Sequence, residues 1–147
     1  MTRSSKGQSP KPRAVTGDYP PVHAVIIGQG DLPRALLESA KAIVPDSGGI
    51  TALSNLECPV AALKAKLEQT ISGFPKGDVV VFADIFGSSC ANAGLEVKRS
   101  HSRVAVLSGV NLSMVVRFLC YRRKKPFAEL IPFLVETGRT AVQAIEL

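Results

Sequence analysis

The chain has 147 residues, 46% of them hydrophobic, which is enough to bury one substantial core and predicts a single globular domain. No apolar stretch is long enough to cross a bilayer and the basic first residues lead into no apolar signal core, so neither membrane insertion nor secretion is expected. Three scattered cysteines without a CxxC pair argue against a disulfide framework and a metal site, and they fit a cytoplasmic protein.

Residues 1–21 read MTRSSKGQSPKPRAVTGDYPP, a composition that predicts a disordered basic tail before a folded domain at 22–147. The tail holds four basic residues and one acidic residue, a net charge of +3, and the rest of the chain, with 14 basic and 11 acidic residues, holds the other +3. The domain is therefore only mildly basic. No nucleic-acid partner is expected, because no recognition motif or aromatic interleaving accompanies the charge.

Short apolar runs then alternate with helical patterns. Strands are predicted at 23–28, 49–53, 78–84 and 103–109. Helices are predicted at 32–44, 59–74, 89–99, 111–122 and 126–147, the last kinked or split because it contains Pro132 and Gly138. In the first helix the apolar positions are Leu32, Ala35, Leu36, Ala40, Ile43 and Val44, with Asp31 as N-cap, and in the second they are Val60, Leu63, Leu67, Ile71 and Phe74. The alternation predicts one α/β domain: a doubly wound, mostly parallel open sheet with helices on both faces.

In such sheets ligands bind at the carboxyl ends of the strands. Three predicted strands end there in polar, Gly-rich loops, at 28–31, 84–89 and 108–111. Each loop opens a helix whose free N–H groups favour an anion, so a phosphate-sized ligand is chemically reasonable. The Gly-x-Gly of the first loop is not a dinucleotide fingerprint, because Pro33 stands where a third small residue is needed and no acidic residue follows at the required distance. A P-loop is excluded as well, and no cofactor is expected.

The three segments IIGQGDLPRALLESA, VVVFADIFGSSCANAG and VAVLSGVNLSMVVRFL together resemble the mannose-family (mannose/fructose/sorbose) IIA component of the bacterial phosphoenolpyruvate:sugar phosphotransferase system. The resemblance covers about residues 22–140 and keeps the family's order and spacing of motifs. It implies a cytoplasmic homodimer whose partners are a histidine-containing phosphocarrier protein and a IIB-type domain. In the family, a histidine after the first strand accepts a phosphoryl group and an aspartate orients its ring.

Gln29 stands at the position of that histidine, and Asp84 at the position of the aspartate. The chain departs from the family pattern at Gly28 (Thr or Ser), Ser88 (Gly), and Cys90 and Ser113 (Pro). On this resemblance the candidate catalytic positions are Gln29, Asp84 and Ser89. The candidate anion- or partner-binding residues are Gly28, Gly30, Phe86, Gly87, Ser88, Cys90, Asn92, Ser108, Gly109 and Asn111.

Glutamine cannot replace histidine as a phosphoryl acceptor, because its amide nitrogen lone pair is delocalised, but its NH₂ group could donate a hydrogen bond to Asp84. Three interpretations of Gln29 are open, ranked in this order: a natural degenerate IIA that binds partners in a dephospho-like state, an active IIA whose histidine was replaced experimentally, and a protein in which another residue accepts phosphate. They correspond to two functions, a regulatory docking protein and an active phosphoryl carrier. Enzyme activity therefore stays an open question at this point.

Simpler roles compete for several of these residues. Asp84 could accept loop N–H bonds, Ser88, Ser89 and Asn111 could be helix N-caps, and Cys90 could be a small buried residue. His23 is expected at the surface, and His101 in a loop at the amino end of its strand. The run Arg122–Lys125 is interpreted first as a solvated helix end, with an acidic protein, a membrane surface or nucleic acid as the alternative partners.

Overall fold

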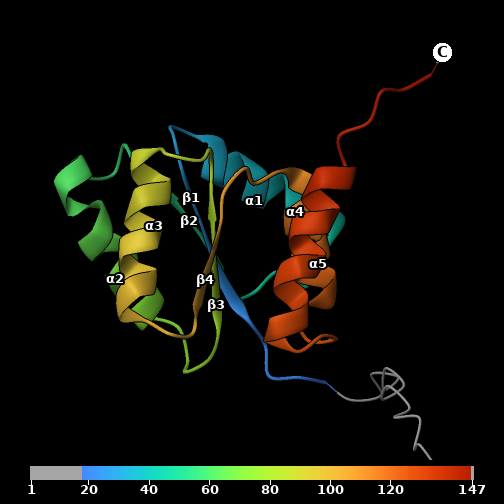
Figure 1. Ribbon diagram of the computed structural model, residues 1–147, viewed down its shortest axis with the longest axis horizontal. Helices are drawn as coiled ribbons and strands as arrows, with labels where there is room; N and C mark the ends of the chain where they lie inside the picture. The colour runs from blue at the N-terminus through green and yellow to red at the C-terminus, as the bar shows by residue number, and fades with distance from the viewer. Residues whose placement is uncertain (1–17, 147) are drawn as a thin grey trace, which may run out of the picture.

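The computed structural model describes residues 18–146, so residues 1–17 of the predicted tail lie outside the described residues. Four strands form one sheet: β1 (His23–Gly28), β2 (Ile50–Ser54), β3 (Val79–Ala83) and β4 (Val104–Leu107). The sheet order is β2-β1-β3-β4 and every pairing is parallel. The predicted doubly wound parallel sheet is confirmed (Figure 1).

Five α-helices cover the two faces of the sheet: α1 (Leu32–Ile43), α2 (Leu63–Ser72), α3 (Ser89–Ser100), α4 (Leu112–Tyr121) and α5 (Phe127–Thr140). A 3₁₀ turn, η1 (Val60–Ala62), precedes α2. Helices α1, α4 and α5 pack on one face, and α2 and α3 pack on the other (Figure 1). No helix in the described part of the chain is long and apolar enough to span a membrane.

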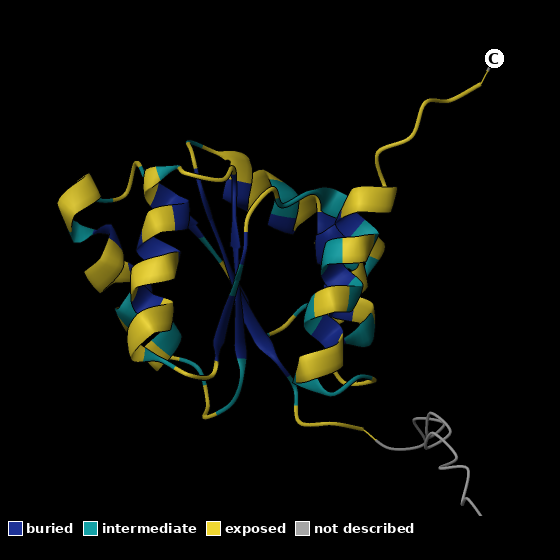
Figure 2. Ribbon diagram, in the orientation of Figure 1, coloured by how far each residue is buried: buried dark blue, intermediate teal, exposed yellow. Residues whose placement is uncertain are grey.

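The central strands divide their side chains between two cores. Along β1, Ala24 and Ile26 belong to the core under α1, α4 and α5, whereas Val25 and Ile27 belong to the core under α2 and α3. This division follows from the two-residue period of a strand, and it explains why a strand covered on both faces is apolar at consecutive positions. Figure 2 shows the sheet as the buried layer between helices whose outer faces are exposed.

The helix faces differ in detail from the predicted ones. In α1 the core residues include Leu37, while Leu32 and Ile43, predicted on the apolar face, are 42% and 58% exposed. They are the first and the last residue of α1. Val60 was predicted on the apolar face of the second helix, but it belongs to the 3₁₀ turn and is 64% exposed.

The prediction of a kinked or split last helix was wrong about the split, because α5 runs as one helix through Pro132. Pro132 is exposed, so the helical hydrogen bond that it cannot donate is lost on the solvent side, where water can satisfy the free carbonyl. Gly138 is buried against α4: a Cβ atom there would lie 2.6 Å from Sδ of Met114. The glycine therefore serves the close approach of two helices rather than a break in one.

Candidate functional site

The two central strands, β1 and β3, place Gln29 and Asp84 side by side at the carboxyl edge of the sheet. From β1 the chain crosses to β2 on one side, and from β3 it crosses to β4 on the other. The gap between β1 and β3 is therefore the topological switch point, where open α/β sheets bind ligands. The loops after β2 and β4 end at the same edge.

Asp84 is 9% exposed and accepts three hydrogen bonds from its surroundings. Its Oδ2 accepts from the backbone N–H of Gln29 at 3.0 Å. Its Oδ1 accepts from the backbone N–H of Ile85 at 2.8 Å and from the hydroxyl of Ser88 at 2.6 Å. The carboxylate thus ties the ends of β1 and β3 and the start of α3 together. Through these three hydrogen bonds Asp84 has a structural role at the site.

The side chain of Gln29 makes no hydrogen bond to Asp84, so the bond considered for its NH₂ group is not formed. Its Oε1 instead accepts a hydrogen bond from Nδ2 of Asn55 at 2.8 Å. Asn55 also accepts, through its Oδ1, a hydrogen bond from the backbone N–H of Gly30 at 3.0 Å. Asn55 therefore holds both the side chain of Gln29 and the turn after it. The contact from Gln29 to Asp84 is made by the backbone, because the turn directs the amide N–H toward the carboxylate.

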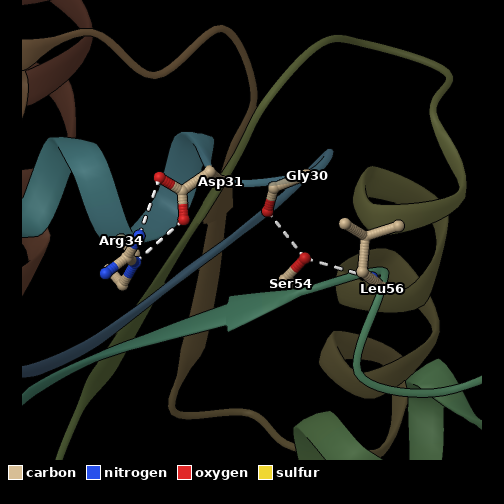
Figure 3. Close-up of polar contacts among 5 residues, drawn as sticks. All are labelled: Gly30, Asp31, Arg34, Ser54 and Leu56. Carbon is tan, nitrogen blue, oxygen red and sulfur yellow. Dashed lines mark hydrogen bonds and ion pairs between the residues drawn. The ribbon is translucent and has the colours of Figure 1, made fainter.

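Figure 3 shows how the first loop is fixed on the other side. The hydroxyl of Ser54 donates to the carbonyl of Gly30 at 2.6 Å and accepts from the backbone N–H of Leu56 at 3.0 Å. Asp31 stands at the N-cap position of α1, but its carboxylate makes no capping hydrogen bond and pairs with Arg34 at 2.8 Å. The Arg34 hydrogen bond lowers the pKa of Asp31. A hollow of about 230 Å³ lies between this loop and the end of β2.

Two glycines fit the loop geometry for different reasons. Gly30 has a φ of +58°, a left-handed conformation that is costly for most other residues. At Gly28 the neighbours are close: a Cβ atom there would be 3.2 Å from Cβ of Asp84 and 3.3 Å from Cγ of Pro33. The absence of a side chain at residue 28 therefore sets how near β1 approaches Asp84.

The helix caps are assigned clearly. Ser88 caps α3 by accepting from the backbone N–H of Ala91 at 3.0 Å, and Asn111 caps α4 by accepting from the backbone N–H of Met114 at 3.1 Å. Ser89 is the exposed first residue of α3 and does not cap it, so the capping role considered for Ser89 belongs to Ser88. Ser88 thus joins the helix cap to Asp84 through one hydroxyl group.

The remaining site positions surround this centre. Cys90 is buried, and burial, with smaller effects of Asp84 and Cys58, raises the pKa of its thiol to about 11. A thiol of this kind is protonated at neutral pH and is a weak nucleophile. The backbone N–H of Gly109 donates to the carbonyl of Asp84 at 3.0 Å, which places the fourth-strand loop at the site. Asn92 and Ser108 are exposed beside it, and Gly87 has a φ of +82° in the turn before α3.

Large apolar side chains project into solvent next to these loops. Phe86 is 92% exposed, Ile85 is 67% exposed, and Leu56, which follows Asn55, is 77% exposed. We call these three residues the apolar rim. Side chains of this size are usually buried, and a group of them beside a polar site is typical of a protein-binding surface.

At the opposite edge of the sheet, the burial of His23 contradicts a prediction. His23 was expected at the surface but is 8% exposed, and its ring stacks on Phe74 with the centroids 5.0 Å apart. His101 follows α3 at the amino end of β4, as predicted. A hollow of about 620 Å³ lies at this edge near His101, and it is larger than the hollow of about 230 Å³ beside the first loop. Its walls come from helix C-termini and strand amino ends, so topology and the hydrogen-bond network favour the switch point as the site.

Sequence reasoning missed Ser54 and Asn55, although a signal was present. They end β2 and follow it in the sequence ITALSN, so strand topology alone brings them to the edge where Gln29 lies. The described residues contain no group of three or more His, Cys, Asp or Glu side chains that could hold a metal ion.

Comparison with known proteins gives a consistent result. Residues 23–135 match the family EIIA-man, described as the PTS system fructose IIA component. The chain is 28% identical over 124 residues to the PTS system fructose-specific EIIA component of Bacillus subtilis, covering 83% of this chain and 85% of that protein. It is 37% identical over 83 residues to the PTS system mannose-specific EIIAB component of Escherichia coli, covering 56% of this chain but only 24% of that longer protein.

Solved structures share the fold. The mannose/sorbose-specific IIA subunit from Enterococcus faecalis superposes with a TM-score of 0.76 at 22% identity, over 86% of this chain and 96% of that one. The phosphotransferase component EIIA from Streptococcus agalactiae superposes with a TM-score of 0.76 at 17% identity, over 84% of this chain and 96% of that one.

Proposed function

We propose a function from one premise: the chain belongs to the EIIA-man family of phosphotransferase IIA components. The proposed role of this protein is regulatory. It docks a histidine-containing phosphocarrier protein, a IIB-type domain or both in the cytoplasm, as a homodimer, and it does not carry phosphate on residue 29. The observation that supports this most directly is Gln29, a residue without a nucleophile, fixed by Asn55 at the switch point.

The chemistry of Gln29 argues against phosphoryl transfer. A phosphoryl acceptor needs a free lone pair directed at phosphorus, and the amide nitrogen of glutamine has none. The amide oxygen is a poor nucleophile and already accepts the hydrogen bond from Asn55. The side chain is neutral and polar, so the loop has the charge of an unphosphorylated acceptor loop at all times.

The neighbouring nucleophiles do not offer a good replacement. The hydroxyl of Ser88 is committed to Asp84 and to the cap of α3. The thiol of Cys90 is buried, with a pKa raised to about 11. Asp84, which would orient a histidine ring, is already surrounded by three donors. These contacts make recruitment of Ser88, Cys90 or Asp84 as the acceptor unfavourable.

The apolar rim supports docking of a protein. Burial of a large side chain such as Phe86 on binding contributes about 1.5–3 kcal/mol, and the rim flanks the loops that carry Gln29 and Asp84. A partner seated on the rim would cover the switch point. The rival function is an active phosphoryl carrier, favoured by the retention of Asp84 at the family position.

Intact-mass measurement separates the two functions. The full chain is incubated with phosphoenolpyruvate, enzyme I and the histidine carrier, and the expected result is no added phosphoryl group. A mass increase of one phosphoryl group in the wild-type chain would refute the regulatory proposal, and peptide mapping would locate the acceptor. Gln29→His is measured in parallel, and a phosphorylated variant beside an unmodified wild type would show that residue 29 alone blocks the transfer.

Docking is measured by calorimetry with the carrier protein and with a IIB domain. Phe86→Ser is expected to weaken binding by about 10- to 100-fold, the value of one buried aromatic side chain. Ile43→Ser is the matched control, because Ile43 is also an exposed apolar residue but ends α1 at the opposite edge. Absence of binding by the wild-type chain to both partners, or equal losses for the two variants, would contradict docking at the rim.

A further inference from the structure

We propose that the end of the molecule opposite the candidate site binds the surface of an anionic lipid bilayer. The contact residues are Arg117, Arg123, Lys124 and Lys125, which we call the basic patch. The inference does not depend on the proposed function of the site. The predicted interpretation of the run Arg122–Lys125 as a solvated helix end is correct for only part of the run. Arg122 is 5% exposed and donates to the carbonyl of Gly48. Arg117, Arg123 and Lys124 are exposed, and Lys125 is half-buried.

The basic patch gathers cations around two aromatic rings. Arg117, Lys124 and Lys125 lie 5.7 to 5.8 Å from the ring centroid of Tyr121, and Lys125 also lies 4.7 Å from that of Phe133. Like charges held around one ring repel each other, so the arrangement is stabilised by an anion that approaches from outside.

Within the described residues, no carboxylate lies within 4.0 Å of a cation of the patch. Elsewhere on the surface Arg34, Lys41 and Arg103 each have a carboxylate within 4.0 Å. None of the four patch cations forms an ion pair with a described residue, and Glu129, the acidic residue nearest in the following helix, is not within ion-pair distance. The charge is therefore available to a partner.

The described part of the chain begins beside the basic patch. The backbone N–H of Tyr19 donates to the carbonyl of Arg123 at 2.7 Å, and Figure 1 shows the start of the described chain at the end where α4 joins α5. Residues 1–17 contain four basic and no acidic residues. In the sequence, four further basic residues therefore precede the part of the chain that starts at this place. A cluster of four to eight Lys and Arg residues of this kind is typical of proteins that bind anionic lipids.

The surroundings of the patch favour a bilayer over the other anionic partners. The hollows at the two ends of the sheet and the hollow between α2 and α3 are lined by other residues, so the patch lies outside them. Single-stranded nucleic acid is bound through exposed aromatic rings that stack on bases, but Tyr121 and Phe133 are half-buried beneath the cations. A bilayer surface presents many phosphates to a group of cations at once, and Tyr19, 36% exposed, suits the interface between lipid and water.

Sedimentation with lipid vesicles tests the proposal on the full chain. Vesicles of phosphatidylcholine alone are compared with vesicles that also contain phosphatidylglycerol, at low and at physiological salt. The wild-type chain is expected to sediment only with the anionic vesicles, and less at higher salt. Each Lys or Arg near such a surface contributes about fivefold to binding, so the triple variant Arg123→Gln, Lys124→Gln, Lys125→Gln is expected to bind about 100-fold more weakly.

The control variant Lys64→Gln, Lys66→Gln, Arg139→Gln removes the same charge from α2 and from the last turn of α5. Circular dichroism melts of both variants show whether the fold is kept, which is expected because the three patch residues do not belong to either core. Three results would each overturn the proposal: no binding of the wild-type chain to anionic vesicles, equal losses in the two triple variants, or tighter binding to an oligonucleotide at equal phosphate concentration.

Discussion

The hydroxyl group of Ser88 contacts both Asp84 and the first turn of α3, so one substitution tests its contribution to stability. Ser88→Ala removes the hydrogen bond to Oδ1 of Asp84 and the cap on the backbone N–H of Ala91. A hydrogen bond to a charged acceptor contributes about 1.5–3 kcal/mol, and a serine N-cap contributes about 1 kcal/mol. Because Asp84 keeps two other donors, we expect the free energy of unfolding to fall by about 2–4 kcal/mol.

Urea denaturation followed by circular dichroism measures this change, with Ser89→Ala as the control. Ser89 is the next residue and makes no hydrogen bond through its side chain to a described residue, so its replacement should change the free energy by less than about 0.5 kcal/mol. A double-mutant cycle with Asp84→Asn should give a coupling energy of about 1 kcal/mol or more. Equal effects of the two serine variants, or no coupling, would refute the reasoning that Ser88 organises the site.

Three further predictions follow from buried groups. Asp84→Asn leaves an amide facing three donors, so the free energy of unfolding should fall by about 2–4 kcal/mol in the same urea assay; an unchanged midpoint would contradict the network. Cys90, whose thiol pKa is raised to about 11 by burial, should be alkylated by iodoacetamide at neutral pH far more slowly than the exposed Cys120, as peptide mass spectrometry would show; comparable rates would contradict its burial. Burial, with Arg122 and Arg123, lowers the pKa of His23, so the unfolded chain binds more protons and stability should decrease as the pH falls through the ordinary histidine range near 6.5. His23→Gln should remove that decrease in thermal melts between neutral and mildly acidic pH, while His101→Gln should keep it.

The sheet could be predicted from the sequence because its central strands are covered on both faces. Strands of this type are continuous apolar runs, and 23–28 was predicted with the bounds that the structure has. The faces of the helices were less predictable. Leu32 and Leu37 are equally apolar in the sequence, and only the position of α1 on the sheet decides which of them is buried.

The site was predicted in its position but not in its contacts. The carboxyl ends of parallel strands meet at one edge, so Gln29 and Asp84 could be paired from topology. The direction of the Gln29 side chain depends on Asn55, which is 26 residues away in the chain and belongs to no recognisable motif. The burial of His23 was missed for a similar reason, since Phe74, on which its ring stacks, is brought to it by the packing of α2.

The close packing at Gly28 means that substitutions at residue 28 depend on its neighbours, Asp84 and Pro33. A side chain at residue 28 would bring its Cβ within 3.2 Å of Asp84 and 3.3 Å of Pro33, so these neighbours would have to move by a few tenths of an ångström first. The effect of a substitution at residue 28 therefore depends on the residues at positions 33 and 84. A chain that regained histidine at residue 29 would still have no room for a larger residue at position 28. That room would appear only after Pro33 or the loop of Asp84 had moved.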